Sequence, residues 1–316
     1  MHNLYKKILI SILLIFFTGI LIAEDVTVYI TKAGTKYHLS TCSYLSSSKI
    51  PISLVEALSQ GYEPCKRCKP PTKVLSVAAP LVISVPRSSG QESLAIPYCA
   101  DENQIHYYTG FALLYAEEHE QASWVAYLLT DDEVNGTIGR TDNFRSDKNI
   151  VTGSAPLSDY RGSGFDRGHL APAGDMKWSE DAMSESFFMS NMSPQEPGFN
   201  RGVWKKLEEW VRDQAELNEE IYVVTGPILT EGSYEKIGEN GVSIPKQYFK
   251  VILDYKEPEI KAIGFILSNT SSTLPISSFA VTVDYVENIT GLDFFYLLDD
   301  SEEEDLEAEV DIRMWD

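Results

Sequence analysis

The chain has 316 residues, a length that allows about two domains, and a formal net charge of −21 that on its face argues against binding nucleic acid. The acid is unevenly placed, however, because residues 299–316 hold ten Asp or Glu against one Arg. Residues 140–212 hold ten Lys or Arg against eleven acids, so the charge of this segment does not exclude an anionic partner.

Residues 1–23 are predicted to be a secretory signal peptide. Lys6 and Lys7 precede a nearly uncharged apolar run of sixteen residues, and an acidic pair follows it. The run is short for a bilayer span, which needs about 20 apolar residues, although an uncleaved anchor stays an alternative. Cleavage near Ala23 predicts a secreted or periplasmic protein with no stable membrane insertion. It also changes the formal charge from −21 to −23, because the lost segment carries two Lys and no acid.

Residues 24–70 form a small module in which His38, Cys42, Cys65 and Cys68 are spaced H-x3-C, then twenty-two residues, then C-x2-C. Three thiolates and one imidazole make a ligand set typical of structural zinc sites. A module of this size needs such a staple, because its core alone is too small. An exported protein meets an oxidising compartment, so the alternative is a disulfide between Cys65 and Cys68, or of either with Cys42 or Cys99.

Residues 71–89 read as a linker, and residues 90–300 are long enough to bury a real core. Apolar runs predict buried strands at 124–129, 221–224, 248–253 and 262–267. Helical periodicity predicts one helix over 201–217 and another around 182–188. With few helices between the strands, the pattern predicts an α+β domain with a central, mainly antiparallel sheet. The acidic tail, 301–316, is expected to be solvated and largely disordered.

The run from Phe165 to His169 contains the residues best suited to catalysis. A neutral imidazole at His169 could take a proton from water near physiological pH, since its ordinary pKa is about 6.5. Asn200 lies at the start of the long helix, where its amide oxygen could bind a cation. Magnesium prefers oxygen ligands and keeps several waters. Arg167 or Arg140 could neutralise charge developing on a phosphate.

Each of these residues also has a plain structural interpretation. A single His is more often structural than catalytic, and an Asn before a helix is usually an N-cap. Glu208 and Arg212 are spaced as an ordinary i,i+4 ion pair on a helix surface. The order and spacing of the whole set carry more information than any one member.

Segment 160–212 resembles the DNA/RNA non-specific endonuclease family, whose members carry a ββα-metal, or His-Me finger, active site. The matching phrases are Asp166-Arg167-Gly168-His169, Ser190-Asn191-Met192-Ser193-Pro194-Gln195, Phe199-Asn200-Arg201-Gly202-Val203-Trp204, Leu207-Glu208 and Arg212. The likeness extends over about 90–300. It implies an endonuclease that hydrolyses DNA and RNA.

The resemblance also implies a role for each matched residue. His169 would activate a water as the general base, and Asn200 would be the direct protein ligand of magnesium, or of another divalent cation such as manganese. Asn191 would help to hold the site and the scissile phosphate, and Glu208 would orient metal-bound water. Arg167 and Arg212 would contact phosphates.

Three alternatives stay open at this stage. The transition-state arginine would be Arg140, unless a small gap shifts the match to Arg145. The chain could instead be an exported nucleic-acid-binding or interaction protein that keeps the fold without activity. Family members are sometimes homodimers, which the sequence does not decide.

The small module, residues 24–70, is similar to Ada-type metal-binding domains. This likeness also favours zinc over disulfides in that module.

Overall fold

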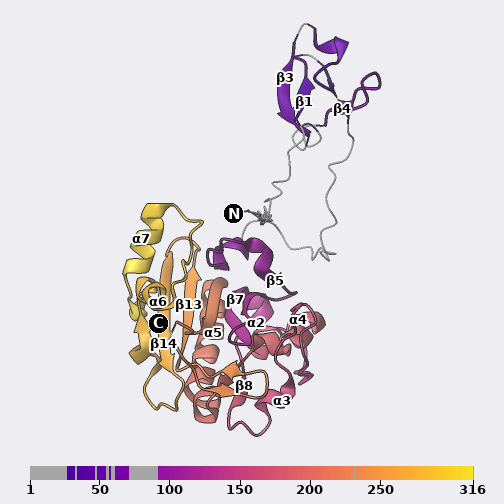
Figure 1. Cartoon of the computed structure of the whole chain (residues 1–316). Helices are drawn as coiled ribbons and strands as arrows, with labels where there is room; N and C mark the ends of the chain where they lie inside the picture. The colour runs from indigo at the N-terminus through magenta and orange to yellow at the C-terminus, as the bar shows by residue number, and fades with distance from the viewer. Residues whose placement is uncertain are drawn as a thin grey trace, which may run out of the picture. The chain divides into compact units, whose positions relative to one another are not determined.

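The computed structural model describes residues 27–70, apart from 33, 47, 55, 56 and 58–60, and residues 92–315, apart from 231. The chain divides into two compact units, Met1–Ser84 and Val85–Asp316 (Figure 1). The expected signal peptide and linker lie outside the described residues. Within the described parts of the chain, no helix is long and apolar enough to cross a membrane.

The smaller unit is built from two short strand pairs. Strands β1 and β3 pair antiparallel, and β2 and β4 pair parallel. A small core joins them, in which Val28, Tyr37 and Leu54 are fully buried. The bounds are β1 Thr27–Ile30, β2 Lys36–Tyr37, the 3-10 helix Ser43–Leu45, β3 Ile50–Ser53 and β4 Glu63–Pro64.

A seven-stranded sheet forms the centre of the larger unit, in the order β15-β14-β13-β10-β7-β6-β5. Every neighbouring pair is antiparallel, which confirms the predicted α+β class. The strands are β5 Ile105–Tyr107, β6 Ala112–Ala116, β7 Gln121–Thr130, β10 Glu220–Pro227, β13 Gln247–Asp254, β14 Lys261–Ser268 and β15 Ala280–Val281. The four predicted strands are therefore present, each slightly longer than expected.

Both faces of this sheet are covered, so its strands alternate between two cores. Val125 and Tyr127 of β7 face the core that contains the long helix, whereas Trp124 and Ala126 face the other core. Figure 1 shows α6 (Val283–Thr290) and α7 (Asp300–Ala308), coloured yellow, beside β13 and β14. These strands are buried on both sides, which explains why their sequences read as continuous apolar runs.

The remaining helices surround the sheet and lead into the site. The long predicted helix begins with a turn over Phe199–Trp204 that is broken by a kink at Gly202, whose backbone is not helical, and continues as α5, Lys205–Asn218. The second predicted helix is α4, Glu180–Glu185, where the Ser179 hydroxyl accepts from the Ala182 amide at 3.3 Å. The other short helices are α2 Asp131–Val134, α3 Leu157–Tyr160, Glu92–Ala95, Glu102–Gln104, Ala173–Asp175, Met189–Asn191, Ile276–Phe279 and Ile312–Trp315.

The expectation of a largely disordered acidic tail is wrong. The tail forms α7 and a final 3-10 helix, and Trp315 is only 2% exposed. The centre of the Trp315 ring lies 5.9 Å from that of the Trp210 ring on α5. The Lys261 ammonium lies 5.0 Å from the centre of the Trp315 ring. The charge count did not predict this ordered segment, because a single buried aromatic side chain can hold an otherwise polar segment against the core.

Candidate active site

Two short strands and the start of the long helix bring the motif residues together. Strand β8, Asp166–His169, pairs antiparallel with β9, Met192–Gln195, and the helical segment from Phe199 follows. Gly168 permits this close pairing, because a Cβ atom there would lie 2.1 Å from the Gln195 side chain. The result is a strand–strand–helix unit of the ββα type that the sequence predicts.

His169 is held as a neutral base at the end of β8. Its ring makes edge contacts with Phe187 at 4.9 Å and Phe144 at 5.7 Å between ring centres. Burial and the positive charges of Arg140 and Arg167 lower the pKa of His169 to about 3, although Asp142 acts in the opposite direction. The Nε2 atom is buried and makes no hydrogen bond to any described residue. The imidazole is therefore unprotonated near neutral pH, as a general base must be.

Asn200 is oriented by a carboxylate that the sequence analysis did not assign to the site. Its side-chain nitrogen donates to Asp166 Oδ2 at 2.9 Å, and Arg201 donates to both oxygens of the same carboxylate at 2.6 and 2.8 Å. Because the amide nitrogen is engaged, the amide oxygen is the atom left for a hard cation. Asp166 could have been suspected from its position in the same motif as His169.

The expected surface pair between Glu208 and Arg212 is replaced by a more buried arrangement. Arg212 donates to Asp175 Oδ1 at 2.7 Å, and the Asp175 side chain is fully buried. The other Asp175 oxygen accepts from the Tyr127 hydroxyl at 2.8 Å. Asp175 thus fixes Arg212 at the cleft. Sequence reasoning missed it because its partners are 37 and 48 residues away.

Glu208 lines the cleft and has an unusual charge environment. Burial raises its pKa to about 7, while the ammonium of Lys250 opposes that rise. Lys250 is fully buried, and its Nζ atom lies 4.9 Å from the Trp204 ring centre with no hydrogen bond to a described residue. The one signal in the sequence is that Lys250 stands inside the apolar strand β13, Gln247–Asp254, which predicts burial of its charge. The partner of that charge could not be predicted, because Glu208 lies 42 residues away on another element.

The structure separates the two candidate arginines. Arg140 lines the cleft, and its guanidinium lies 4.7 Å from the Phe187 ring centre, beside His169. Arg145 donates to the Ser184 carbonyl at 2.7 Å and packs over Phe188 at 4.0 Å. Of the two, Arg140 is therefore the one that lines the cleft, where its Nε atom donates to Asp142 Oδ1 at 2.7 Å.

Asn191 does not face the cleft, which corrects the expectation that it contacts the scissile phosphate. Its side chain is fully buried. Its Oδ1 accepts from the Ala171 amide at 2.9 Å, and its Nδ2 donates to the carbonyls of Ala171 at 2.9 Å and Ser186 at 2.8 Å. Asn191 therefore holds the backbone that follows His169. The family motif singles out Asn191, but only the hydrogen bonds in the structure show that its role is to hold the backbone.

Apart from Asn191, the residues predicted for catalysis and magnesium binding surround an open cleft of about 420 Å³. It is lined by five cationic side chains, one carboxylate, one imidazole, one amide and a short turn: Arg140, Arg167, Arg201, Lys205, Arg212, Glu208, His169, Asn200, Pro172, Ala173 and Gly174. The lining is rich in cations although the whole chain is acidic, and four of the five pair with carboxylates: Arg140 with Asp142, Arg201 with Asp166, Lys205 with Glu209 and Arg212 with Asp175. Such a cleft attracts polyanions, and the single carboxylate and amide oxygen suit a hard divalent cation.

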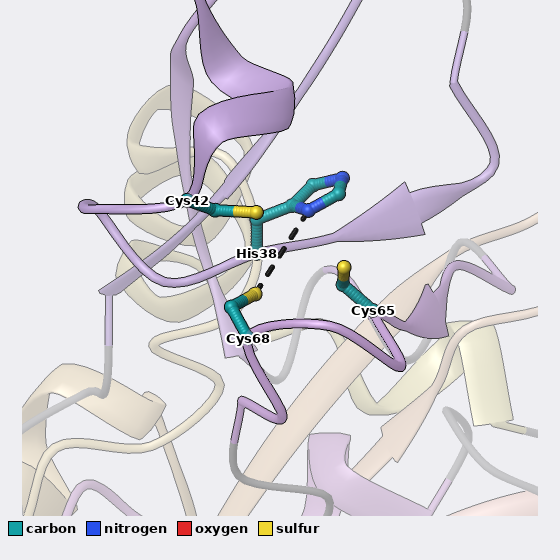
Figure 2. Close-up of side chains that lie close together, drawn as sticks. All are labelled: His38, Cys42, Cys65 and Cys68. Atoms are coloured by element: carbon teal, nitrogen blue, oxygen red, sulfur yellow. Dashed lines mark hydrogen bonds between the residues drawn. The ribbon is translucent and has the colours of Figure 1, made fainter.

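The smaller unit contains a separate cluster of ligand atoms (Figure 2). The ligand atoms of His38, Cys42, Cys65 and Cys68 all lie within 4.8 Å of one another, and all four cysteines of the chain are free thiols. Burial alone would raise the pKa of Cys65, but hydrogen bonds from the Cys68 and Arg67 amides outweigh it and lower that pKa. Burial raises the pKa of Cys68 to about 11. This donor set could hold a metal ion.

Comparison with known proteins agrees with this geometry. The family model described as DNA/RNA non-specific endonuclease matches residues 91–301. A nuclease of Nostoc sp. is 31% identical over 276 residues, which cover 83% of this chain and 98% of that protein. Mitochondrial endonuclease G of Bos taurus is 33% identical over 239 residues, covering 70% of this chain and 80% of that protein. Nuclease C1 of Cunninghamella echinulata is 37% identical over 205 residues, covering 60% and 81%.

A solved structure shows the same fold. A chain in the crystal structure of the EndoG/EndoGI complex superposes with a TM-score of 0.62 at 32% identity, covering 68% of this chain and 94% of that one. The chain belongs to the DNA/RNA non-specific endonuclease family. The family match does not extend over the smaller unit, so the likeness of that unit to Ada-type domains stays a prediction.

Proposed function

We propose that this protein is an exported, magnesium- or manganese-dependent endonuclease that hydrolyses DNA and RNA without sequence preference. The observation that carries the proposal is the placing of a neutral His169 and an oriented Asn200 in one cleft with five cationic side chains. Export is supported only by residues 1–23, whose pattern is that of a signal peptide.

The chemistry follows from what each side chain can do. His169 accepts a proton from a water molecule, whose oxygen then attacks the phosphorus while the bond to the leaving oxygen breaks. Arg140 and Arg167 stabilise the negative charge that develops on the phosphoryl oxygens. Asn200 would hold a divalent cation and Glu208 would orient water bound to it, and the cation would supply Lewis-acid stabilisation of the leaving oxygen. Arg212, fixed by Asp175, holds a neighbouring phosphate.

The cleft also predicts how substrates are chosen. Its charged side chains suit phosphate groups, and phosphate contacts position a nucleic acid without reading its bases. Because each neutralised phosphate releases bound counterions, substrate binding should weaken steeply as salt rises. Sequence and sugar preference should both be weak.

A direct test is to incubate the mature protein with plasmid DNA and with RNA, with magnesium or with chelator. We expect both substrates to be cut only when the metal is present. His169→Ala should lower kcat by about 10²- to 10⁴-fold, the usual contribution of a general base. His106→Ala is the matched control, because His106 does not line the cleft.

The same assay decides the alternative of an inactive binding protein. Wild-type protein that leaves both substrates intact while retaining them in a filter-binding assay would establish that alternative and overturn the nuclease. Equal cutting by wild type and His169→Ala would instead show that His169 is not the base.

For the smaller unit we propose a structural zinc ion held by His38, Cys42, Cys65 and Cys68. The support is the convergence of one imidazole and three thiols, the closed ligand set of structural zinc sites (Figure 2). The small size of the core points the same way, because its buried hydrophobic residues are few. Zinc would act on folding and would take no part in hydrolysis.

A further inference from the structure

The second group of converging ligand atoms lies between the last two α-helices, away from the nuclease cleft. The carboxylates of Asp284 and Glu287 on α6 and of Glu307 on α7 have oxygens within 4.8 Å of one another. Asp284 and Glu287 are three residues apart and so share a face of α6. Glu307 reaches them from the last turn of α7.

Glu307 is the member that needs an explanation. It is only 5% exposed, and its Oε1 atom is buried without a hydrogen-bond partner among the described residues. A buried carboxylate without a partner is costly, because it has lost its water. The end of α7 adds to this cost, since the helix dipole is negative there and no basic residue stands in the last turn.

Among the described residues, no salt bridge joins Asp284, Glu287 or Glu307 to a basic side chain. Asp293 and Glu303 are further acidic neighbours of the cluster. One oxygen of Glu287 accepts from the Phe294 amide at 2.7 Å, whereas the buried Oε1 atom of Glu307 has no such partner. A buried carboxylate among other carboxylates is left to bind a proton or a cation.

We propose that Asp284, Glu287 and Glu307 bind a calcium ion that fastens the acidic helix α7 to α6. Three oxygens that all lie within 4.8 Å of one another can surround a single ion at no more than about 2.8 Å each, which is close to the roughly 2.3–2.6 Å of calcium–oxygen bonds. All three carboxylates can therefore reach one calcium ion with little movement. Magnesium needs shorter distances and stricter geometry. Asp284 is partly exposed, which leaves the site open to solvent for entry of the ion and for water ligands.

The consequence of this site is an ion-dependent attachment of the C-terminal segment. Helix α7 carries acidic residues in its first turn, and the partly buried Leu306 is its contact with the core. A cation would remove the repulsion between α7 and α6 and add a link between them. The chain beyond α7 leads to Trp315, which packs against α5.

The test is thermal unfolding of the full chain with and without 10 mM CaCl₂, at ionic strength matched with NaCl. All proteins carry Asn200→Ala, so that a cation in the nuclease cleft does not contribute. For a dissociation constant on the order of 1 mM, the ion should raise Tm by roughly 3–6 °C. Glu307→Gln should abolish this rise. Glu304→Gln, an exposed residue on the same helix with the same charge change, should keep it.

Asp284→Asn provides a second variant, because the change keeps the size of a partly exposed side chain and should do little harm to folding. We expect it to weaken calcium binding at least tenfold in calorimetric titration. A Tm rise of equal size in Glu307→Gln and Glu304→Gln would overturn the site, and so would the absence of any rise in the parent protein. None of these readouts depends on nuclease activity.

Discussion

At the scale of single residues, the least expected feature of the cleft is the mutual influence of Glu208 and Lys250. Burial raises the pKa of Glu208 to about 7 and lowers that of Lys250 to about 8, while the charge of each opposes the shift of the other. Glu208 is thus poised near neutral pH. Its carboxylate is present above pH 7 and is lost as the pH falls through that value.

The pKa of Glu208 near 7 predicts that nuclease activity depends on pH, and that Lys250 shifts this dependence. If the Glu208 carboxylate helps to hold the cation, kcat/KM should fall as the pH drops below about 7. Lys250→Met removes the charge that favours the carboxylate, so the acid limb should move to higher pH by about 1 unit. Lys148→Met, an exposed lysine, should leave the limb in place. An unchanged acid limb in Lys250→Met would show that Lys250 does not tune the site.

At the scale of elements, helix α5 is packed from two sides. Its inner face carries Leu207 and Val211 against the sheet, and its partly buried Trp210 contacts Phe265 and Trp315. The same helix presents Glu208 and Arg212 to the cleft. The C-terminal segment therefore supports an element that carries two site residues.

We expect Trp315→Ala to lower the free energy of unfolding by about 3 kcal/mol, because it removes a buried aromatic side chain. Urea unfolding followed by circular dichroism measures this change. Met314→Ala should cost far less, since Met314 is 43% exposed. Equal effects from both substitutions would mean that the tail does not depend on the Trp315 contact.

At the scale of the whole molecule, the two units carry different kinds of stabilisation. The larger unit buries two extensive cores on either face of its sheet, whereas the smaller unit buries only a few side chains. The smaller unit should therefore depend on its ligand cluster, and the larger should not.

Removal of zinc should thus unfold the smaller unit alone. We expect metal analysis of the native protein to find one zinc ion, and Cys65→Ser to lose it. Amide hydrogen exchange should then become fast in residues 27–70 and stay slow in the central sheet. Nuclease activity with added magnesium should be unchanged. If the native protein contains no zinc and Cys65 is in a disulfide, a covalent cross-link stabilises the smaller unit instead of a metal ion.

The sequence by itself determined the elements and the motif. Apolar runs in β7, β10, β13 and β14 are long enough to predict strands, because both faces of the sheet are covered. The common site of His169, Asn200 and Glu208 was predicted from the resemblance of segment 160–212 to the DNA/RNA non-specific endonuclease family, since each residue alone also has a plain structural interpretation. The cysteine and histidine spacing predicted the ligand cluster of the smaller unit in the same way.

Only the tertiary structure decided which side chains face the cleft and what holds them. Asp175 and Lys250 act on Arg212 and Glu208 from other elements, and neither is near its partner in the sequence. Burial of Asn191 and Trp315 likewise depends on packing between distant segments. Local patterns record the period of a strand or helix, but the charge and burial at one point depend on every element that packs around it.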